Sequence, residues 1–218
     1  MQALAQNGNG NAAYIDNLNE ARKVLVDEAG STLFTIAKDV KFQVEFNPAK
    51  IHDYRLIGYE TRMLKQEGFN NDKVDAGDVG SGHSITALYE ITVVESKEKL
   101  IDDLRYQKTA PKQKVDSSSE YAFLKIRYKL PDEDISNLIT MPINQEQEFD
   151  SIENTPLDMR FAASVAAFGQ VLRNDPYTGE FGYDDIIRLA EPARGRDQFG
   201  YRSEFVNLVR LAKTARGM

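Results

Sequence analysis

The stretch DKVDAGDVGSGHS, residues 72–84, combines two kinds of residue that can do chemistry, carboxylates and glycines. Carboxylates that converge on one point can bind calcium. An EF-hand loop needs oxygen ligands at positions 1, 3 and 5, glycine at 6 and glutamate at 12. Counted from Asp72, the glycine is in place, but positions 3, 5 and 12 hold Val74, Ala76 and His83. The EF-hand motif is therefore absent, and the remaining alternative is weaker calcium binding by Asp72, Asp75 and Asp78.

The glycines of this stretch have two interpretations, a phosphate-binding loop or a bend. A phosphate loop follows a strand and ends in Gly-Lys-Ser or Gly-Lys-Thr, and neither feature is present. The neighbouring aspartates would also repel a phosphate. Because glycine permits the positive φ angles of tight bends, we interpret residues 72–84 as a bend that leads into a strand beginning near Ile85.

Two further patterns could hold a metal ion, and both are incomplete. DSSSE, residues 116–120, resembles the Asp-x-Ser-x-Ser motif of a metal-ion-dependent adhesion site, but Glu120 occupies the last position. The preceding KQKV is also not the buried strand that this motif follows. The two histidines, His52 and His83, lie outside any HExxH pattern and far from each other. We therefore predict no metal ligands in this chain.

Candidates for catalysis are equally incomplete. The chain has no cysteine, and no Gly-x-Ser-x-Gly elbow supports a serine nucleophile. Acidic neighbours point to different faces, which favours solvated acids; they are Asp102–Asp103, Asp132–Glu133 and Asp184–Asp185. A pair of carboxylates from distant strands, as in a glycosidase, is the alternative that sequence leaves open. We predict no enzyme, no catalytic or cofactor-binding residues and no cofactor.

Composition narrows the choice of partners. The chain has 218 residues, 41% of them hydrophobic, and a net charge of -7. This is enough for one large core or two smaller ones. The negative charge argues against nucleic acid and against an anionic membrane surface, and no apolar run is long enough to span a membrane. MQALAQNGNGN at the start shows no signal-peptide pattern. We expect a protein partner of unknown identity.

The elements that must position these residues begin with a helix. Asn17 and Glu20 form a capping pair, and the apolar residues that follow predict a helix over residues 16–37. The period then changes to the alternation of a strand, and we predict strands over 40–46, 53–61, 85–96, 120–130 and 136–144. The third, apolar on both sides, is expected to be central, and Pro142 places the last at an edge.

Helical periodicity returns after residue 150. Thr155 is expected to cap a helix that buries Phe161, Val165, Phe168 and Leu172. A second helix is predicted over 183–191, ended by Pro192, and a third over 199–215 with a buried stripe of Tyr201, Phe205, Leu208 and Ala212. The arginines among these helices alternate with acids, which indicates a solvated surface of mixed charge. Residues 97–120 are polar, and we expect a long loop there, with a long hairpin tip or a short helix as the alternatives.

These elements predict an α+β fold: an antiparallel β-sheet or sandwich unit, preceded by one long helix and followed by a three-helix C-terminal tail. The expected divisions are a strand end plus helix over 1–38, the antiparallel β domain over 39–150, and a helical tail over 151–218 that packs on it.

Several long segments resemble one family. One segment is similar to the last strand and helix of a von Willebrand factor A domain in bacterial cell-envelope proteins, together with the junction that follows: NAAYIDNLNEARKVLVDEAGSTLFTIAKDVKFQVEFNPAKI. The segments DAGDVGSGHSITALYEI, YAFLKIRYK and RFAASVAAFGQVLRNDPYTGEFGYDDIIRLAEPARGRDQFGYRSEF resemble the domain of unknown function that follows it.

The resemblance implies a non-catalytic interaction or scaffold module in the periplasm or on a surface lipoprotein, and the alternative is a carbohydrate-processing hydrolase domain. The adhesion-site residues of such A domains would lie upstream, so none is assigned here. The helix over 16–37 would lack the sheet on which its apolar face packs in an A domain, and exposed apolar surface is costly. We therefore expect that helix to pack on the β unit or to pair with a second copy as a homo-oligomer.

Overall fold

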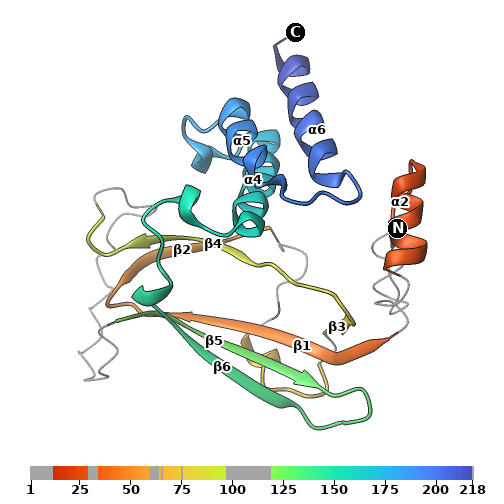
Figure 1. Ribbon diagram of the computed structural model, residues 1–218. Helices are drawn as coiled ribbons and strands as arrows, with labels where there is room; N and C mark the ends of the chain where they lie inside the picture. The colour runs from red at the N-terminus through yellow and green to blue at the C-terminus, as the bar shows by residue number, and fades with distance from the viewer. Residues whose placement is uncertain are drawn as a thin grey trace. The chain divides into compact units, whose positions relative to one another are not determined.

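The computed structural model describes residues 12–28, 34–58, 64, 66–74, 76–96 and 119–217 (Figure 1). It contains antiparallel sheets and C-terminal helices, so the predicted α+β class is confirmed. The chain forms two compact units. The sheet unit comprises Thr35–Val79 and Ala87–Glu148, and the helical unit comprises Met1–Phe34, Gly80–Thr86 and Phe149–Met218.

A four-stranded sheet forms the larger part of the sheet unit. Its strands are β3 (Gly77–Gly80), β1 (Thr35–Phe46), β5 (Glu120–Lys129) and β6 (Asn137–Asn144), in that spatial order. Phe42 of β1 lies opposite Ile126 of β5, which lies opposite Ile139 of β6. Because facing residues share a side, one face of this sheet is apolar and the other bears the lysines and arginine of β5. The predicted strands over 120–130 and 136–144, the latter at an edge, are confirmed.

The second sheet has two strands, β2 (Ile51–Ile57) and β4 (Leu88–Val93). The expectation that residues 85–96 form a central strand was wrong, because β4 pairs only with β2 in the described part of the chain. Apolar residues on both sides of a strand favour burial of both faces, but they do not determine how many strands pair with it. Here the ring of Tyr89 contacts Phe46 of the other sheet, with centroids 5.3 Å apart.

The long helix expected over residues 16–37 is replaced by shorter elements. Helix α2 (Leu18–Arg22) continues as a π-helical turn, η1 (Lys23–Asp27), and β1 already begins at Thr35. The predicted cap is confirmed, because the Glu20 amide donates to Asn17 Oδ1 at 2.9 Å. The prediction failed beyond η1 because the apolar residues near position 36 join the β1 strand, whose ladder with β5 already pairs Lys38 with Lys129.

Three α-helices follow residue 150 in the described part of the helical unit: α4 (Leu157–Arg173), α5 (Tyr183–Ala190) and α6 (Tyr201–Arg216). Short 3-10 turns occur in both units; they are η2 (Gln66–Gly68) and η3 (Gln145–Gln147) in the sheet unit, and η4 (Ile152–Asn154), η5 (Pro176–Thr178) and η6 (Pro192–Arg194) in the helical unit.

The core of the helical unit consists of Val171, Ile186 and Val209. Phe205 packs edge-on against Phe161 and Phe168, with centroids 5.2 and 5.5 Å apart.

The buried face of α4 is rotated from the predicted one. Val165 and Leu172 are 43% and 52% exposed, whereas Ser164 and Val171 are buried. Positions three apart are as close on a helix as positions four apart, so periodicity alone did not distinguish the two faces. Ser164 can be buried because its hydroxyl donates to the Phe161 carbonyl at 2.6 Å.

Two other details of the helical prediction were wrong. The Thr155 hydroxyl donates to the Ile152 carbonyl at 2.7 Å and does not cap α4, which begins after Pro156. In α6, Leu208 is 51% exposed while Val206 and Val209 are buried. The helix positions were predicted correctly, and the choice of the inward face depended on the partner helices.

Candidate functional site

The stretch that contains Asp72 folds against the polar face of the four-stranded sheet. Asp72 Oδ1 accepts hydrogen bonds from Ser136 Oγ at 2.5 Å and from Arg127 Nη2 at 3.1 Å. Lys129 Nζ donates to the Asp72 carbonyl at 2.9 Å, and Lys41 Nζ donates to the Asn71 carbonyl at 2.6 Å. The Ser136 hydrogen bond and the adjacent cations hold the pKa of the Asp72 carboxyl below its usual value.

Asp39 connects the same loop to β1 and β5. Its Oδ2 is 2.6 Å from Lys129 Nζ, and its Oδ1 accepts the Ala76 amide at 3.1 Å. Burial raises the pKa of Asp39, but the hydrogen bonds from Lys129 and Ala76 outweigh burial, so this pKa is lowered. Asp39 has a φ of 51°, at the irregular point of the β1–β5 ladder. We call Asp39, Asp72, Arg127, Lys129 and Ser136 the polar cluster.

The opening stretch is therefore mainly a loop held by the sheet. The carboxylates of Asp72 and Asp78 bind different partners: Asp72 accepts from Ser136 and Arg127, whereas Asp78 Oδ1 accepts the Asp39 amide at 3.2 Å. Asp75, the third acid of the weaker calcium alternative, lies outside the described residues. Gly82 has a φ of 80°, as the bend interpretation requires, although Gly77–Gly80 forms strand β3, which sequence did not predict. In the described part of the chain, no three His, Asp or Glu side chains are grouped to hold a metal ion.

The other candidates are scattered. His52 Nδ1 lies 2.7 Å from Asp53 Oδ2, its neighbour in sequence, and His83 lies elsewhere in a loop. Asp184 pairs with Lys213 at 2.5 Å, whereas Asp185 pairs with Arg188 at 2.7 Å. Asp132 and Glu133 are exposed in the β5–β6 turn. Glu120 begins β5, and four predicted candidates lie outside the described residues: Asp102, Asp103, Asp116 and Ser118.

Among the residues that the structure describes, five carboxylates have a pKa below the usual value: Asp39, Asp72, Glu153, Asp185 and Asp197. In each, hydrogen bonds or nearby cations favour the charged form. A general acid needs the opposite shift, toward neutral pH. These five side chains therefore have the electrostatics of structural ion pairs and helix caps.

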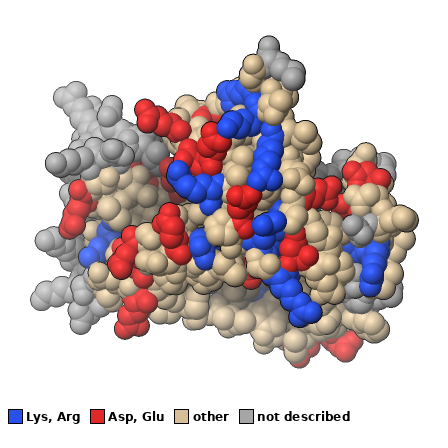
Figure 2. Space-filling view, turned by 45° about the horizontal axis from the view of Figure 1, so that its top comes forward, with Lys and Arg blue, Asp and Glu red and all other residues tan. Residues whose placement is uncertain are grey.

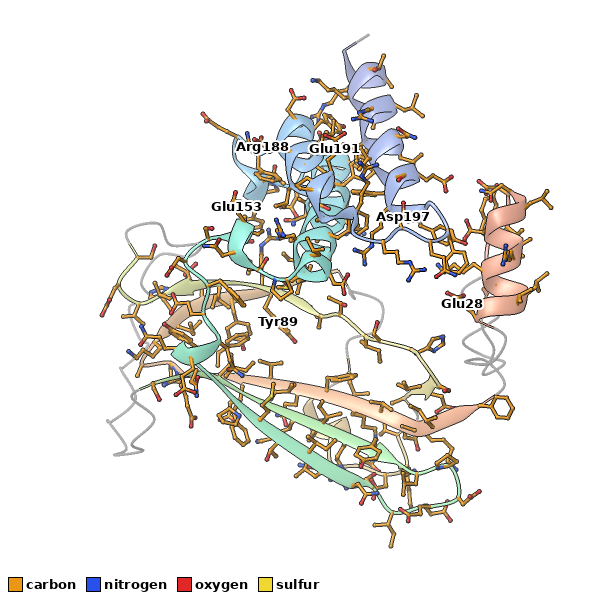
Figure 3. All side chains as sticks on the ribbon, in the orientation of Figure 1. Glu28, Tyr89, Glu153, Arg188, Glu191 and Asp197 are labelled. Atoms are coloured by element: carbon orange, nitrogen blue, oxygen red, sulfur yellow. The ribbon has the colours of Figure 1, made fainter. Side chains whose placement is uncertain are left out.

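Asp197 shows the cap most clearly (Figure 3). Its two carboxylate oxygens accept the amides of Arg202 at 3.1 Å and Ser203 at 2.8 Å, in the first turn of α6. Burial alone would raise the pKa of Asp197. The hydrogen bonds from the two amides and from the Ser203 hydroxyl have the larger effect, so the pKa of Asp197 is lowered. The carboxylate satisfies two amides that the helix itself leaves without acceptors.

Replacing Asp197 with alanine should cost about 1–2 kcal/mol of unfolding free energy at pH 7. Since the folded pKa is lowered, the charge stabilises the fold above about pH 4 and this contribution is lost as the pH falls. The difference between wild type and Asp197→Ala should therefore shrink between pH 5 and pH 3. Urea unfolding followed by circular dichroism at 222 nm measures the free energy of unfolding of the two proteins at each pH. Asp197→Asn, which keeps an acceptor without titrating, is the control, and an undiminished difference at pH 3 would contradict the assignment.

One arginine of the tail contacts several elements of the helical unit. Arg202 Nη2 lies 2.5 Å from Asp158 Oδ1 of α4, and Nη1 donates to the Ala193 carbonyl of η6 at 3.0 Å. Its guanidinium lies 4.9 Å from the centroid of the Phe161 ring. Sequence analysis interpreted these arginines as a solvated surface, and Figure 2 does show Lys and Arg alternating with Asp and Glu. No sequence pattern distinguished Arg202 from its exposed neighbours.

Helix α2 and the following turn η1 retain exposed apolar side chains. Leu18, Leu25 and Val26 are 88%, 67% and 66% exposed. Lys23 Nζ, at the start of η1, lies 4.3 Å from the centroid of the Tyr201 ring, at the start of α6 within the helical unit. Self-association through residues 16–37 remains a prediction.

Opposite the polar cluster, the apolar faces of the two sheets meet at an aromatic group. The ring centroids of Phe46 and Tyr54 are 4.3 Å apart. Tyr89 points from β4 toward the four-stranded sheet (Figure 3), and its pKa is raised by burial and by the neighbouring Tyr54. Away from this contact, apolar side chains of the described strands remain partly exposed on these faces. We call the half-exposed residues the inner apolar surface: Phe42, Tyr54, Ile91, Ile139 and Met141, which are 45%, 58%, 41%, 49% and 43% exposed.

The two faces of the four-stranded sheet differ in an unusual way. Its own loop covers the polar face, where Lys41 is only 3% exposed, while the apolar face keeps Phe42 of β1 half exposed. Exposed apolar patches on soluble proteins commonly mark binding surfaces. The alternation in β1 and β5 predicted which of their residues share this face. The sequence did not indicate that the side chains on this face would stay half exposed, nor that Ile139 and Met141 of β6 would join them.

These features define the class of the protein: an α+β domain with two small antiparallel sheets, an open apolar sheet face and a helical C-terminal unit. The chain belongs to the family described as "Uncharacterized protein YfbK, C-terminal", whose model matches residues 31–215. This agrees with the predicted domain of unknown function.

The uncharacterized protein YfbK of Escherichia coli (strain K12) is 47% identical over 212 residues, which cover 97% of this chain and 36% of that protein. The chain thus spans about a third of the length of this relative. No solved structure matches the chain. No helix in the described part of the chain is long and apolar enough to cross a membrane.

Proposed function

We propose that this chain is a non-catalytic interaction module that binds another protein through the inner apolar surface. The observation that supports this function most directly is the half exposure of Phe42, Ile139 and Met141 on one face of the four-stranded sheet. A partner that covers these side chains would gain about 25 cal/mol per Å² of apolar surface removed from water. The low pKa values of the carboxylates named above fit a structural role for those groups.

The proposal includes a place in a larger protein. The similarity of residues 1–38 to the end of a von Willebrand factor A domain supports such a domain upstream, as does the match of the family model from residue 31 onward. The greater length of the E. coli relative leaves room for it. We propose that the whole protein acts at the bacterial cell envelope and that any adhesion-site metal is bound by the upstream domain.

Site-specific photo-cross-linking tests the interaction. A benzophenone amino acid would replace Met141 on the inner apolar surface and, in a control, Lys73, which is exposed in the loop on the opposite face. The full chain would be produced in its own cells and irradiated there. We expect one discrete protein adduct from position 141 and none from position 73.

The result requires a second measurement to be decisive. Ile139→Lys should abolish the adduct at position 141 while leaving the circular dichroism spectrum unchanged, because Ile139 is 49% exposed. An adduct of equal yield from both positions, or none from position 141, would refute an interaction surface at this face.

A further inference from the structure

The free edge of the four-stranded sheet lies beside the inner apolar surface. β6 pairs with β5 on one side, and on its other side no strand of the described residues follows it. Proteins usually protect such edges with charged residues, proline or bulges. The sequence of β6, NLITMPIN, contains no charged residue. Its one protective residue is Pro142.

The position of Pro142 indicates which backbone groups face outward. Pro142 lies opposite Phe123 of β5. Proline has no N–H, so it is tolerated where that group would point away from the neighbouring strand. Because the hydrogen-bonding direction alternates along a strand, the N–H and carbonyl groups of Leu138 and Thr140 point outward as well. The edge therefore offers an added strand the N–H and carbonyl groups of Leu138 and Thr140 and, at Pro142, a carbonyl alone.

The side chains beside this edge are apolar. Ile139 and Met141 lie on the same face as Phe42 and bring the inner apolar surface to the edge. Leu138, on the opposite face, is 58% exposed. In β-strand addition, backbone hydrogen bonds provide affinity and alternate side chains provide specificity. A segment with alternating apolar residues would satisfy both requirements here.

The acidic residues at both ends of β6 determine which charges an added strand can carry. Three exposed acids precede β6 and two follow it: Asp132, Glu133, Asp134, Glu146 and Glu148. In the part of the chain that the structure describes, none of these five carboxylates forms an ion pair with a lysine or arginine. A second copy pairing antiparallel through β6 would place the acids of one end against those of the other, which is unfavourable. Basic residues at both ends of a partner segment would be attracted.

We propose that the outer edge of β6 binds an extended segment of a partner protein, which adds a strand and carries lysine or arginine on both sides of an alternating apolar centre. β6 has eight residues, so this centre would span ~27 Å. The inference names the chemistry of the partner and rests on the proposed function.

A labelled peptide tests the edge directly. The probe has alternating threonine and valine over about eight positions with two lysines at each end, and its control carries glutamates at the ends. Fluorescence anisotropy with the purified full chain should show at least tenfold tighter binding of the lysine peptide. Raising the salt concentration should weaken that binding, because the acids are exposed.

Two variants locate the binding. Thr140→Pro removes an outward N–H while leaving the pairing with β5 intact, and it should weaken binding at least tenfold; Thr140→Val keeps the N–H and should bind normally. Asp132→Lys combined with Glu146→Lys should reverse the preference toward the glutamate peptide. Neither acid side chain makes a hydrogen bond or ion pair to another described residue, so the fold, checked by circular dichroism, should persist.

Three outcomes would overturn the inference: equal binding of the two peptides, unchanged affinity in Thr140→Pro, or a dimer in sedimentation that Thr140→Pro dissociates. The dimer would show that a second copy occupies the edge. If position 141 still forms its protein adduct in cells while neither peptide binds, the proposed function stands and only the strand-addition inference fails. If the adduct at position 141 and the binding of the peptides are both absent, the proposed function and the strand-addition inference both fail.

Discussion

Replacing Asp39 with asparagine should lower the free energy of unfolding of the sheet unit by about 2 kcal/mol. Asparagine tolerates the positive φ at this position and can still accept the Ala76 amide, so the change removes mainly the charge. The Lys129 ammonium, whose side chain is 12% exposed, would then lose its carboxylate partner. Urea unfolding followed by tyrosine fluorescence suits this chain, which has no tryptophan.

A matched control lies on the same strand. Glu45 also pairs with a lysine of β5, at 3.4 Å from Lys125, but its side chain is 67% exposed. Glu45→Gln should therefore change stability by less than about 0.5 kcal/mol. The cost of Asp39→Asn combined with Lys129→Met should be smaller than the sum of the two single costs, because the single changes each leave one charge without its partner.

The pH dependence gives an independent test of the same residue. The pKa of Asp39 is lowered in the fold, so its stabilising effect is complete above about pH 4–5 and decreases as acid protonates the folded carboxyl. Asp39→Asn should show a shallower loss of stability between pH 5 and pH 3 than wild type. Parallel curves for the two proteins would contradict a stabilising charge at position 39.

Replacing Arg202 with alanine should cost the helical unit about 3 kcal/mol. The change removes the bond to the Ala193 carbonyl and the contact with the Phe161 ring, which account for most of this cost. The pair with Asp158 contributes little, because the Asp158 side chain is 85% exposed. Ala193 is fully buried, so its carbonyl would lose a donor in a place where water does not readily replace it. Circular dichroism at 222 nm during urea unfolding measures this cost, because the helices dominate that signal.

Two further variants separate charge from geometry in this prediction. Arg202→Lys keeps the charge but cannot reach a carboxylate, a carbonyl and a ring together, so it should recover less than half of the loss. Arg196→Ala should have an effect below about 0.5 kcal/mol, because Arg196 is exposed in the same segment. Equal effects of Arg196→Ala and Arg202→Ala would show that Arg202 does not connect these elements.

Much of the fold followed from local patterns. Alternation in β5 predicted which residues face together, Pro142 predicted the edge, and the three C-terminal helices appeared at the expected positions. The failures concern partners distant in sequence. Whether residues 34–37 continue a helix or begin a strand depends on the distant segment that contains β3, where the Ser81 amide donates to the Phe34 carbonyl at 2.9 Å. The inward face of α4 likewise depends on α5 and α6.

The acidic residues of the polar cluster could be identified from sequence, but their partners could not. The sequence showed Asp72 and its neighbours as a group of acids that lacks the complete calcium motif. It could not show that the partners are Arg127, Lys129 and Ser136, because these lie 55 or more positions away along the chain. The inner apolar surface was likewise visible as alternating residues, while its exposure depends on how far apart the two sheets lie beyond the Phe46 contact.

The pairing of β1 with β5 has a consequence for synthesis on the ribosome. Asp39 and Lys129 are 90 positions apart, so the ladder cannot close until the later strand has emerged. At ~5–20 residues per second, β1 waits several seconds with its apolar residues available to other chains. The helical unit needs mostly contacts between α4, α5 and α6, which follow one another closely. Nascent chains arrested before β5 should therefore recruit chaperones, and chains arrested after β6 should need them less.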